Sequence, residues 1–159
     1  MNHGLDTDSQ VFFYEQEFYV LSNFSSFCID WRGRLFHTSE AVYHFEKFEG
    51  RPDIQNLIAD AKSAHEALKI ARRNEALVAP GWDAVRTETM EEILIEKVRQ
   101  HEYVRRKLLE TGDRELVENS WRDSFWGIGK DGKGQNTLGK LWMKIREMLR
   151  STPSNYGYF

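Results

Sequence analysis

The chain has 159 residues, of which 40% are hydrophobic and 13% aromatic, so it can bury one core and is too aromatic for a disordered protein. Its 22 Lys and Arg against 25 Asp and Glu give a net charge of -3, unlike a strongly basic nucleic-acid-binding protein, although this sum still allows a local basic patch. One cysteine excludes a disulfide framework and a multi-cysteine zinc site. Short apolar runs exclude a membrane span, and the first ten residues lack a signal-peptide pattern, so we expect a cytoplasmic protein.

The N-terminal part of the sequence predicts a small β element. Aromatic, β-favouring runs at 11–14 and 18–21 are followed by alternating apolar and polar residues at 27–31. Arg32-Gly33 then supplies the turn of a hairpin. Cys28 lies within the alternating run without an evident base partner, and we expect it to be a small core residue.

From Thr38 onward the apolar residues repeat with a helical period. Thr38 is a suitable N-cap for a helix that buries Ala41, Phe45 and Phe48. Further helices are predicted at 53–59, at 63–73 from a Ser63–Glu66 capping box, at 89–112 from a Thr89–Glu92 capping box, and from 138 to 149.

This order of elements predicts the α+β class, as a mostly helical single domain with a small N-terminal β element. We expect a flexible N-terminus at 1–10, one domain at 11–150 and a C-terminal tail at 151–159.

The helix after Thr38 carries a polar stripe. Glu40, Tyr43, His44 and Lys47 are spaced i, i+3, i+4 and i+7, which places a carboxylate, a phenol, an imidazole and an amine along one face. The alternative is a solvated face, with a Glu40–His44 pair that contributes a few tenths of a kcal/mol.

A glycine-rich segment at 123–136 is the second candidate for chemistry. Its formal Gly127-x-Gly129-x-x-Gly132 match to a dinucleotide fingerprint is rejected, because no βαβ unit surrounds it. The glycines could instead form an anion nest with Lys130 and Lys133, and the alternative is a flexible, solvated turn.

The tryptophans and histidines divide into core and candidate site residues. Trp31 and Trp142 are expected in the core, whereas Trp82 and Trp126 lie in predicted loops and could stack on a planar ligand. The five histidines lack metal-ligand spacing, so neither a metal nor a cofactor is expected.

Taken together, several motifs resemble the YbiA-like, or NADAR, family over residues 12–150. They are, in chain order, Leu21-Ser22-Asn23-Phe24, Thr38-Ser39-Glu40 with Tyr43 and Lys47-Phe48, Trp82, Met90, Leu109-x-Thr111-Gly112, Leu116-Val117-Glu118, Asp123-x-Phe125-Trp126-Gly127-x-Gly129, Gly132-Lys133-Gly134-x-Asn136-x-Leu138-Gly139 and Arg146. The chain departs from the family at Ala41, where members often carry His, and at Glu46, where they often carry Gln.

The resemblance implies an α+β fold and an N-glycosidase that cleaves the bond between ribose C1′ and a nitrogen. Two substrate classes are associated with the family. One comprises the phosphorylated ribosylamino-pyrimidine intermediates of riboflavin biosynthesis, and the other is ADP-ribose attached to guanine in nucleic acid. We take the first as the leading expectation, with release of ribose 5-phosphate.

Cleaving this bond builds positive charge at C1′ and requires a proton on the leaving nitrogen, which suits carboxylates. Glu40 and Asp123 are the candidates, with their roles left open, and Lys47 could instead attack a ring-opened sugar as a Schiff base. Guided by the family, we assign ribose contacts to Asn23 and Asn136, and the 5′-phosphate to Lys133 with the loop of Gly127 and Gly129. The base is assigned to Trp82 or Trp126, and Tyr43 and His44 are further substrate contacts.

Two alternatives stay open. A glycosidase acting on ADP-ribosylated nucleic acid would want a basic rim, for which Arg72, Arg73, Arg105 and Arg106 are candidates. A non-catalytic module that binds ADP-ribose or NAD would not need Glu40, Lys47 and Asp123 together. The oligomeric state is not encoded in any motif of the sequence.

Overall fold

The computed structural model describes residues 5–14 and 16–152, so most of the expected C-terminal tail and the first four residues lie outside the described residues. The chain forms two compact units. The central unit is Asn23–Gln100, and the terminal unit combines the described residues of Met1–Ser22 and His101–Phe159. Helices predominate over a few short strands, which confirms the α+β class.

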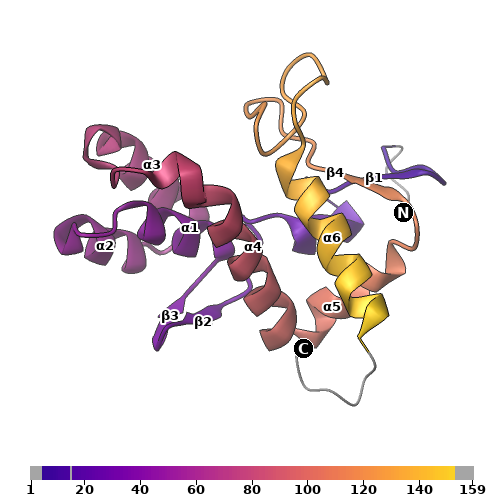
Figure 1. The fold of residues 1–159 in the computed structure, drawn as a ribbon, viewed down its shortest axis with the longest axis horizontal. Coiled ribbons are helices and arrows are strands. Elements are labelled where there is room, and N and C mark those ends of the chain that lie inside the picture. The colour runs from indigo at the N-terminus through magenta and orange to yellow at the C-terminus, as the bar shows by residue number, and fades with distance from the viewer. Residues whose placement is uncertain (1–4, 15, 153–159) are drawn as a thin grey trace. The chain divides into compact units, whose positions relative to one another are not determined.

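The central unit contains a hairpin, four α-helices and one 3-10 helix, and Figure 1 shows its α-helices and hairpin. Its elements are β2 (Ile29–Trp31), β3 (Arg34–Phe36), α1 (Ser39–Lys47), α2 (Pro52–Ala59), α3 (Ala64–Arg73), the 3-10 helix η2 (Glu75–Leu77) and α4 (Trp82–Gln100). The terminal unit contains β1 (Gln10–Phe12), the 3-10 helix η1 (Gln16–Leu21), α5 (Glu102–Glu110), β4 (Glu115–Val117) and α6 (Thr137–Ser151).

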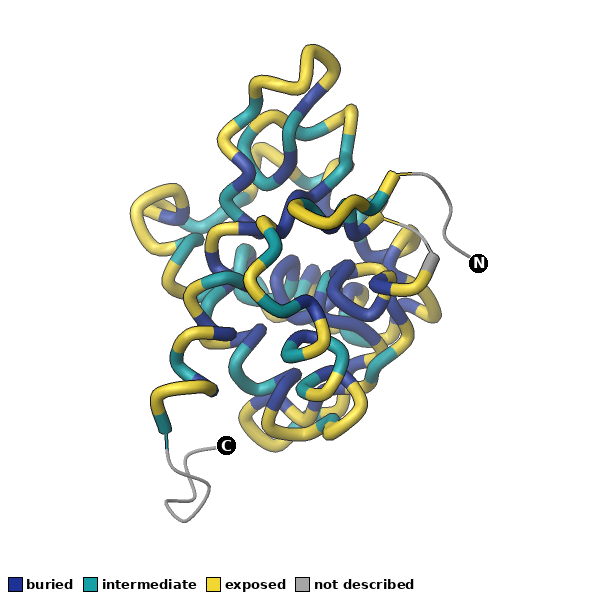
Figure 2. The backbone as a smooth tube through the Cα atoms, turned by 90° about the vertical axis from the view of Figure 1, so that its right-hand side faces the viewer, coloured by how far each residue is buried: buried dark blue, intermediate teal, exposed yellow. Residues whose placement is uncertain are grey.

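The predicted hairpin and the predicted helix starts in the central unit are largely confirmed. β2 and β3 pair antiparallel, and the turn between them has positive φ at Arg32 and Gly33. Thr38 caps α1 by accepting the Ala41 amide at 3.1 Å, and Ser63 caps α3 by accepting the Glu66 amide at 3.1 Å. α1 packs against α2, α3 and α4, and α2 also packs against α3. Figure 2 shows the buried, intermediate and exposed parts of the chain.

Three predictions in or next to the central unit are wrong. Thr89 does not start a helix, because α4 begins at Trp82 directly after Pro80-Gly81 and continues without a break. The predicted helix also does not run on to Gly112, because the extended backbone of His101 separates α4 from α5. Cys28 is exposed rather than in the core, since it lies just before β2 begins.

The terminal unit is organised by a strand pair that joins distant parts of the sequence. β1 pairs in parallel with β4, with Val11 opposite Leu116. The strand predicted at 18–21 is wrong, because this segment folds as η1, in which Phe18 and Leu21 are buried. The amphipathic pattern of α6 is confirmed, and Trp142 on its buried face donates its Nε1–H to the Leu21 carbonyl at 2.8 Å.

Candidate functional site

The predicted site residues fall into two clusters, one in each unit. The central cluster comprises Asn23, Glu40, Tyr43, His44, Lys47 and Trp82. The terminal cluster comprises Asp123, Trp126, Gly127, Gly129, Lys133 and Asn136. Each cluster is described by itself.

The central cluster is built around a partly buried carboxylate–imidazole pair on α1. Glu40 Oε1 lies 2.8 Å from His44 Nε2, and the side chains are only 12% and 5% exposed. This stripe is therefore not the solvated face that the sequence left open. An ionised carboxylate only accepts, so Nε2 carries the hydrogen, and Nδ1 of a neutral ring is then an acceptor.

Aromatic rings surround this pair. The Tyr43 ring centroid lies 5.2 Å from that of His44 and 5.2 Å from that of Trp82, which is buried as the first residue of α4. Among the described residues, neither His44 Nδ1 nor Trp82 Nε1 has a hydrogen-bond partner, although both atoms are buried. Buried polar atoms are normally paired with protein groups or ordered water, so each of these two atoms has the capacity for one further hydrogen bond.

Lys47 lies at the other end of the stripe and forms an ion pair of its own. Its Nζ is 3.3 Å from Glu75 Oε2 of η2, and the lysine side chain is 15% exposed. Sequence reasoning missed Glu75, because an exposed glutamate 28 positions away carries no signal of this contact.

Asn23 anchors the start of α1. Its Oδ1 accepts the Ser39 hydroxyl at 3.0 Å, and its backbone carbonyl accepts the Glu40 amide at 3.1 Å. The amide nitrogen contacts Met90 Sδ at 3.5 Å. Asn23 therefore holds the turn that carries Glu40. Its partner Ser39 is fully buried and had no role assigned from the sequence.

In the terminal cluster, Asp123 organises the turn before the glycine loop. Its Oδ1 accepts the amides of Phe125 at 2.8 Å and Trp126 at 2.7 Å. The Phe125 and Trp126 rings pack edge to face at 4.8 Å. The other carboxylate oxygen of Asp123 has no hydrogen bond within the described part of the chain, so it is available for acid–base work.

The glycine loop is a built structure rather than a flexible turn. Its amides donate to carbonyls between 118 and 129, and they belong to Ile128, Gly129, Gly132, Gly134, Gln135 and Asn136. A Cβ on Gly134 would lie 2.5 Å from the Gly127 carbonyl oxygen, which explains why this position needs glycine. Because these amides face the loop's own carbonyls, an anion at the loop would be held mainly by the exposed side chains of Lys130 and Lys133.

Asn136 fastens this loop to the rest of the terminal unit. Its backbone is left-handed, with φ of 52°. The buried side chain accepts the Glu118 amide at 2.9 Å and donates to the Leu116 carbonyl at 2.9 Å. These contacts are structural, and they occupy both ends of the amide that the sequence analysis assigned to ribose.

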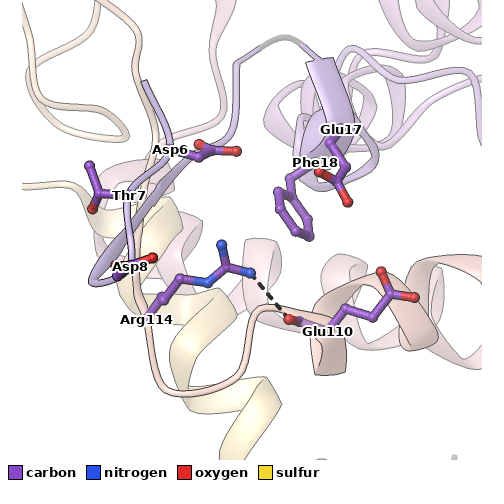
Figure 3. A pocket seen from close by; sticks show the side chains of 7 residues that line it. All are labelled: Asp6, Thr7, Asp8, Glu17, Phe18, Glu110 and Arg114. Atoms are coloured by element: carbon purple, nitrogen blue, oxygen red, sulfur yellow. Dashed lines mark hydrogen bonds between the residues drawn. The ribbon is translucent and has the colours of Figure 1, made fainter. Parts of the chain in front are cut away.

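Each unit contains a cavity, and neither of these two cavities is lined by a predicted site residue. The cavity of the terminal unit, about 610 Å³, lies between η1 and α5 and is rich in carboxylates (Figure 3). There Arg114 donates to the Glu110 carbonyl at 3.2 Å and stacks on Phe18 at 5.3 Å. The cavity of the central unit measures about 290 Å³ and reaches the cap of α1 at Thr38.

Neither a membrane-spanning helix nor a metal-binding group is present among the described residues. No helix there has the length and apolar character to cross a membrane. No group of three or more His, Cys, Asp or Glu in the same residues is arranged to hold a metal ion.

Comparison with known proteins gives consistent matches. The NADAR domain model matches residues 12–150. The chain is 38% identical to N-glycosidase Npun_R5314 of Nostoc punctiforme, over 94% of this chain and 98% of that protein. It is 34% identical to riboflavin biosynthesis protein VVA0006 of Vibrio vulnificus, over 90% of this chain but 39% of that longer protein. The NMR structure of the E. coli protein YbiA is 29% identical and superposes with a TM-score of 0.82, covering 96% of this chain and 94% of that one.

Proposed function

We propose, from the premise that this chain belongs to the NADAR family, that it hydrolyses the C1′–N bond of phosphorylated ribosylamino-pyrimidines and releases ribose 5-phosphate. The coarser activity, an N-glycosidase of the hydrolase class, follows from the relatives of that name. The name of the Vibrio vulnificus protein supports a substrate from riboflavin biosynthesis.

The observation that carries the proposal is the Glu40–His44 pair, in which a mostly shielded carboxylate meets a buried imidazole. As the C1′–N bond breaks, positive charge builds on C1′, and a carboxylate shielded from water stabilises this charge more strongly than an exposed one. His44 fixes one oxygen of Glu40 at 2.8 Å and so orients the other. Glu40 then acts as the ionised partner of the cationic sugar, or as the base that takes a proton from the attacking water.

The unpaired polar atoms near this pair have a place in the same reaction. His44 Nδ1 accepts from a sugar hydroxyl, and Trp82 Nε1 donates to a substrate oxygen. The Tyr43 ring contacts the rings of both His44 and Trp82.

Lys47 offers a second route to the same products. In a ring-opened sugar, its neutral amine would form a bond to C1′ while the C1′–N bond to the pyrimidine amine breaks, and water would then hydrolyse the imine. The proton that the amine loses on forming this bond goes to the leaving pyrimidine amine, and the ion pair between Lys47 Nζ and Glu75 must open before the amine attacks C1′.

The terminal cluster supplies further candidates, each of which needs its own test. Asp123 is the second candidate for acid–base work, and Trp126 is a candidate for stacking on the leaving base.

A cleavage assay with two substrates tests this function. One arm offers a ribosylamino-pyrimidine 5′-phosphate, the other an oligonucleotide with ADP-ribosylated guanine, and mass spectrometry detects the products. Ribose 5-phosphate from the first arm supports the proposal. Restored guanine in the second arm alone would replace it with the nucleic-acid activity. Tight binding of ADP-ribose without turnover in either arm would replace it with a non-catalytic module.

A further inference from the structure

The cavity of the central unit lies where the segment before β2, the start of α1 and the start of α3 come together. Its wall includes three side chains that carry N–H donors, His37, Lys62 and His65, together with the exposed ring of Phe24. The cavity has a volume of about 290 Å³. The sequence analysis assigned no role to any of these residues.

The charge of this wall is unusual for the chain. The protein has a net charge of -3, yet the residues lining the cavity include neither Asp nor Glu. Lys47 and Lys107 pair with carboxylates, whereas the side chains of Lys62, His37 and His65 have no hydrogen bond or ion pair to any described residue. Glu66 does not line the cavity but accepts the Lys62 backbone amide at 2.8 Å. The lining itself supplies cationic and N–H groups, which favours an anion there.

The size of the cavity limits which anion fits. Small-molecule sites usually enclose roughly 300–1,000 Å³, so this cavity is at the small end of the range. It is large enough for a phosphate monoester with part of its sugar, and too small to enclose a dinucleotide such as ADP-ribose.

We propose that this cavity binds the phosphate monoester of the ribosyl substrate, with Lys62, His37 and His65 as its donors. This inference rests on the proposed function and deepens it. Thr38 lines the cavity and also caps α1, and Glu40 lies in the first turn of that helix. A phosphate held here therefore lies at the end of α1 that carries the candidate catalytic carboxylate.

The glycine loop is the competing place for the phosphate. Its amides donate to the loop's own carbonyls, which leaves the phosphate to exposed lysines such as Lys133. Lys62, His37 and His65 are exposed as well, but they gather around one cavity, whereas Lys133 lines neither of the two cavities described above, and this difference favours the central cavity over the loop.

Steady-state kinetics of the full chain test the assignment with four variants. Lys62→Gln and His65→Gln each remove a donor from the cavity, and Lys133→Gln removes one from the glycine loop. Lys69→Gln is the matched control, because Lys69 is an exposed residue of α3 outside the cavity. Each variant is assayed with the ribosylamino-pyrimidine 5′-phosphate and with the same compound lacking its phosphate.

A hydrogen bond to a charged group contributes about 1.5–3 kcal/mol, so losing the Lys62 contact is expected to raise KM for the phosphorylated substrate about tenfold or more, with kcat nearly unchanged. The KM of wild type should be higher by a similar factor for the substrate that lacks its phosphate. With that substrate, Lys62→Gln should have the same KM as wild type. A wild-type KM in both Lys62→Gln and His65→Gln overturns the proposal, as does a rise confined to Lys133→Gln.

Direct binding separates this proposal from the proposed function. Ribose 5-phosphate is titrated into wild type and Lys62→Gln while the ring-proton NMR signals of the histidines are followed. We expect shifts of two histidine signals in wild type and a weaker affinity in Lys62→Gln. If no histidine signal shifts in a wild type that cleaves the substrate, the phosphate site is wrong while the function stands. If wild type cleaves neither substrate but the signals shift, the function fails and the site stands.

Discussion

Replacing Asn136 by Ala should destabilise the protein rather than simply weaken substrate binding. The substitution leaves the Glu118 amide without its acceptor and the Leu116 carbonyl without its donor, both in a buried setting. Each unpaired group costs about 1–3 kcal/mol, and alanine at a φ of 52° adds about 1 kcal/mol. The expected loss in free energy of unfolding is therefore at least about 3 kcal/mol.

For a chain of this length, about 3 kcal/mol corresponds to a fall in Tm of roughly 6–12 °C. Differential scanning calorimetry measures this fall, and Asn136→Gly is the matched control because glycine tolerates positive φ but lacks the side chain. Asn136→Gly should lose most of the stability that Asn136→Ala loses. A wild-type Tm together with a raised KM in Asn136→Ala would refute this reasoning and restore Asn136 as a ribose ligand.

Substitutions at three other positions probe separate contacts. Gly139→Ala should lower the free energy of unfolding by about 1–3 kcal/mol, because its Cβ would overlap the Leu116 carbonyl oxygen, and a wild-type denaturation midpoint would contradict this. Asp123→Asn should keep the wild-type Tm, because it keeps an acceptor for the Phe125 and Trp126 amides. Asp123→Ala lacks that acceptor and should lower the free energy of unfolding by about 2 kcal/mol. If Lys47 forms an imine, borohydride should trap a sugar adduct on wild type, detected by mass spectrometry, and none on Lys47→Arg; full turnover by Lys47→Arg would exclude that route.

Local patterns were the most predictable part of this fold. The caps at Thr38 and Ser63, the hairpin turn and the amphipathic face of α6 depend on residues within a few positions of one another. The pairing of β1 with β4 joins segments about 100 positions apart, and three-residue strands carry too little pattern to predict a partner. The capping-box match at Thr89 failed because two residues of suitable type recur inside a long helix by chance.

The candidate site shows the same limit. The i, i+4 spacing of Glu40 and His44 predicted their contact, because a helix fixes that distance. The structural roles of Asn23 and Asn136 were not predictable, since their partners are backbone groups brought close only by folding. The donors around Lys62 were missed for a similar reason, because His37 reaches the cavity from a separate segment before α1.

Turnover of Glu40→Gln on the ribosylamino-pyrimidine 5′-phosphate is the most direct test of the central claim. Glutamine keeps an acceptor for His44 Nε2 but cannot carry the negative charge. Glu49→Gln is the control, because Glu49 is exposed just beyond the end of α1. We expect Glu40→Gln to release ribose 5-phosphate about 10²–10⁴-fold more slowly than wild type, at an unchanged Tm. Equal turnover by Glu40→Gln and Glu49→Gln would contradict a catalytic role for this carboxylate.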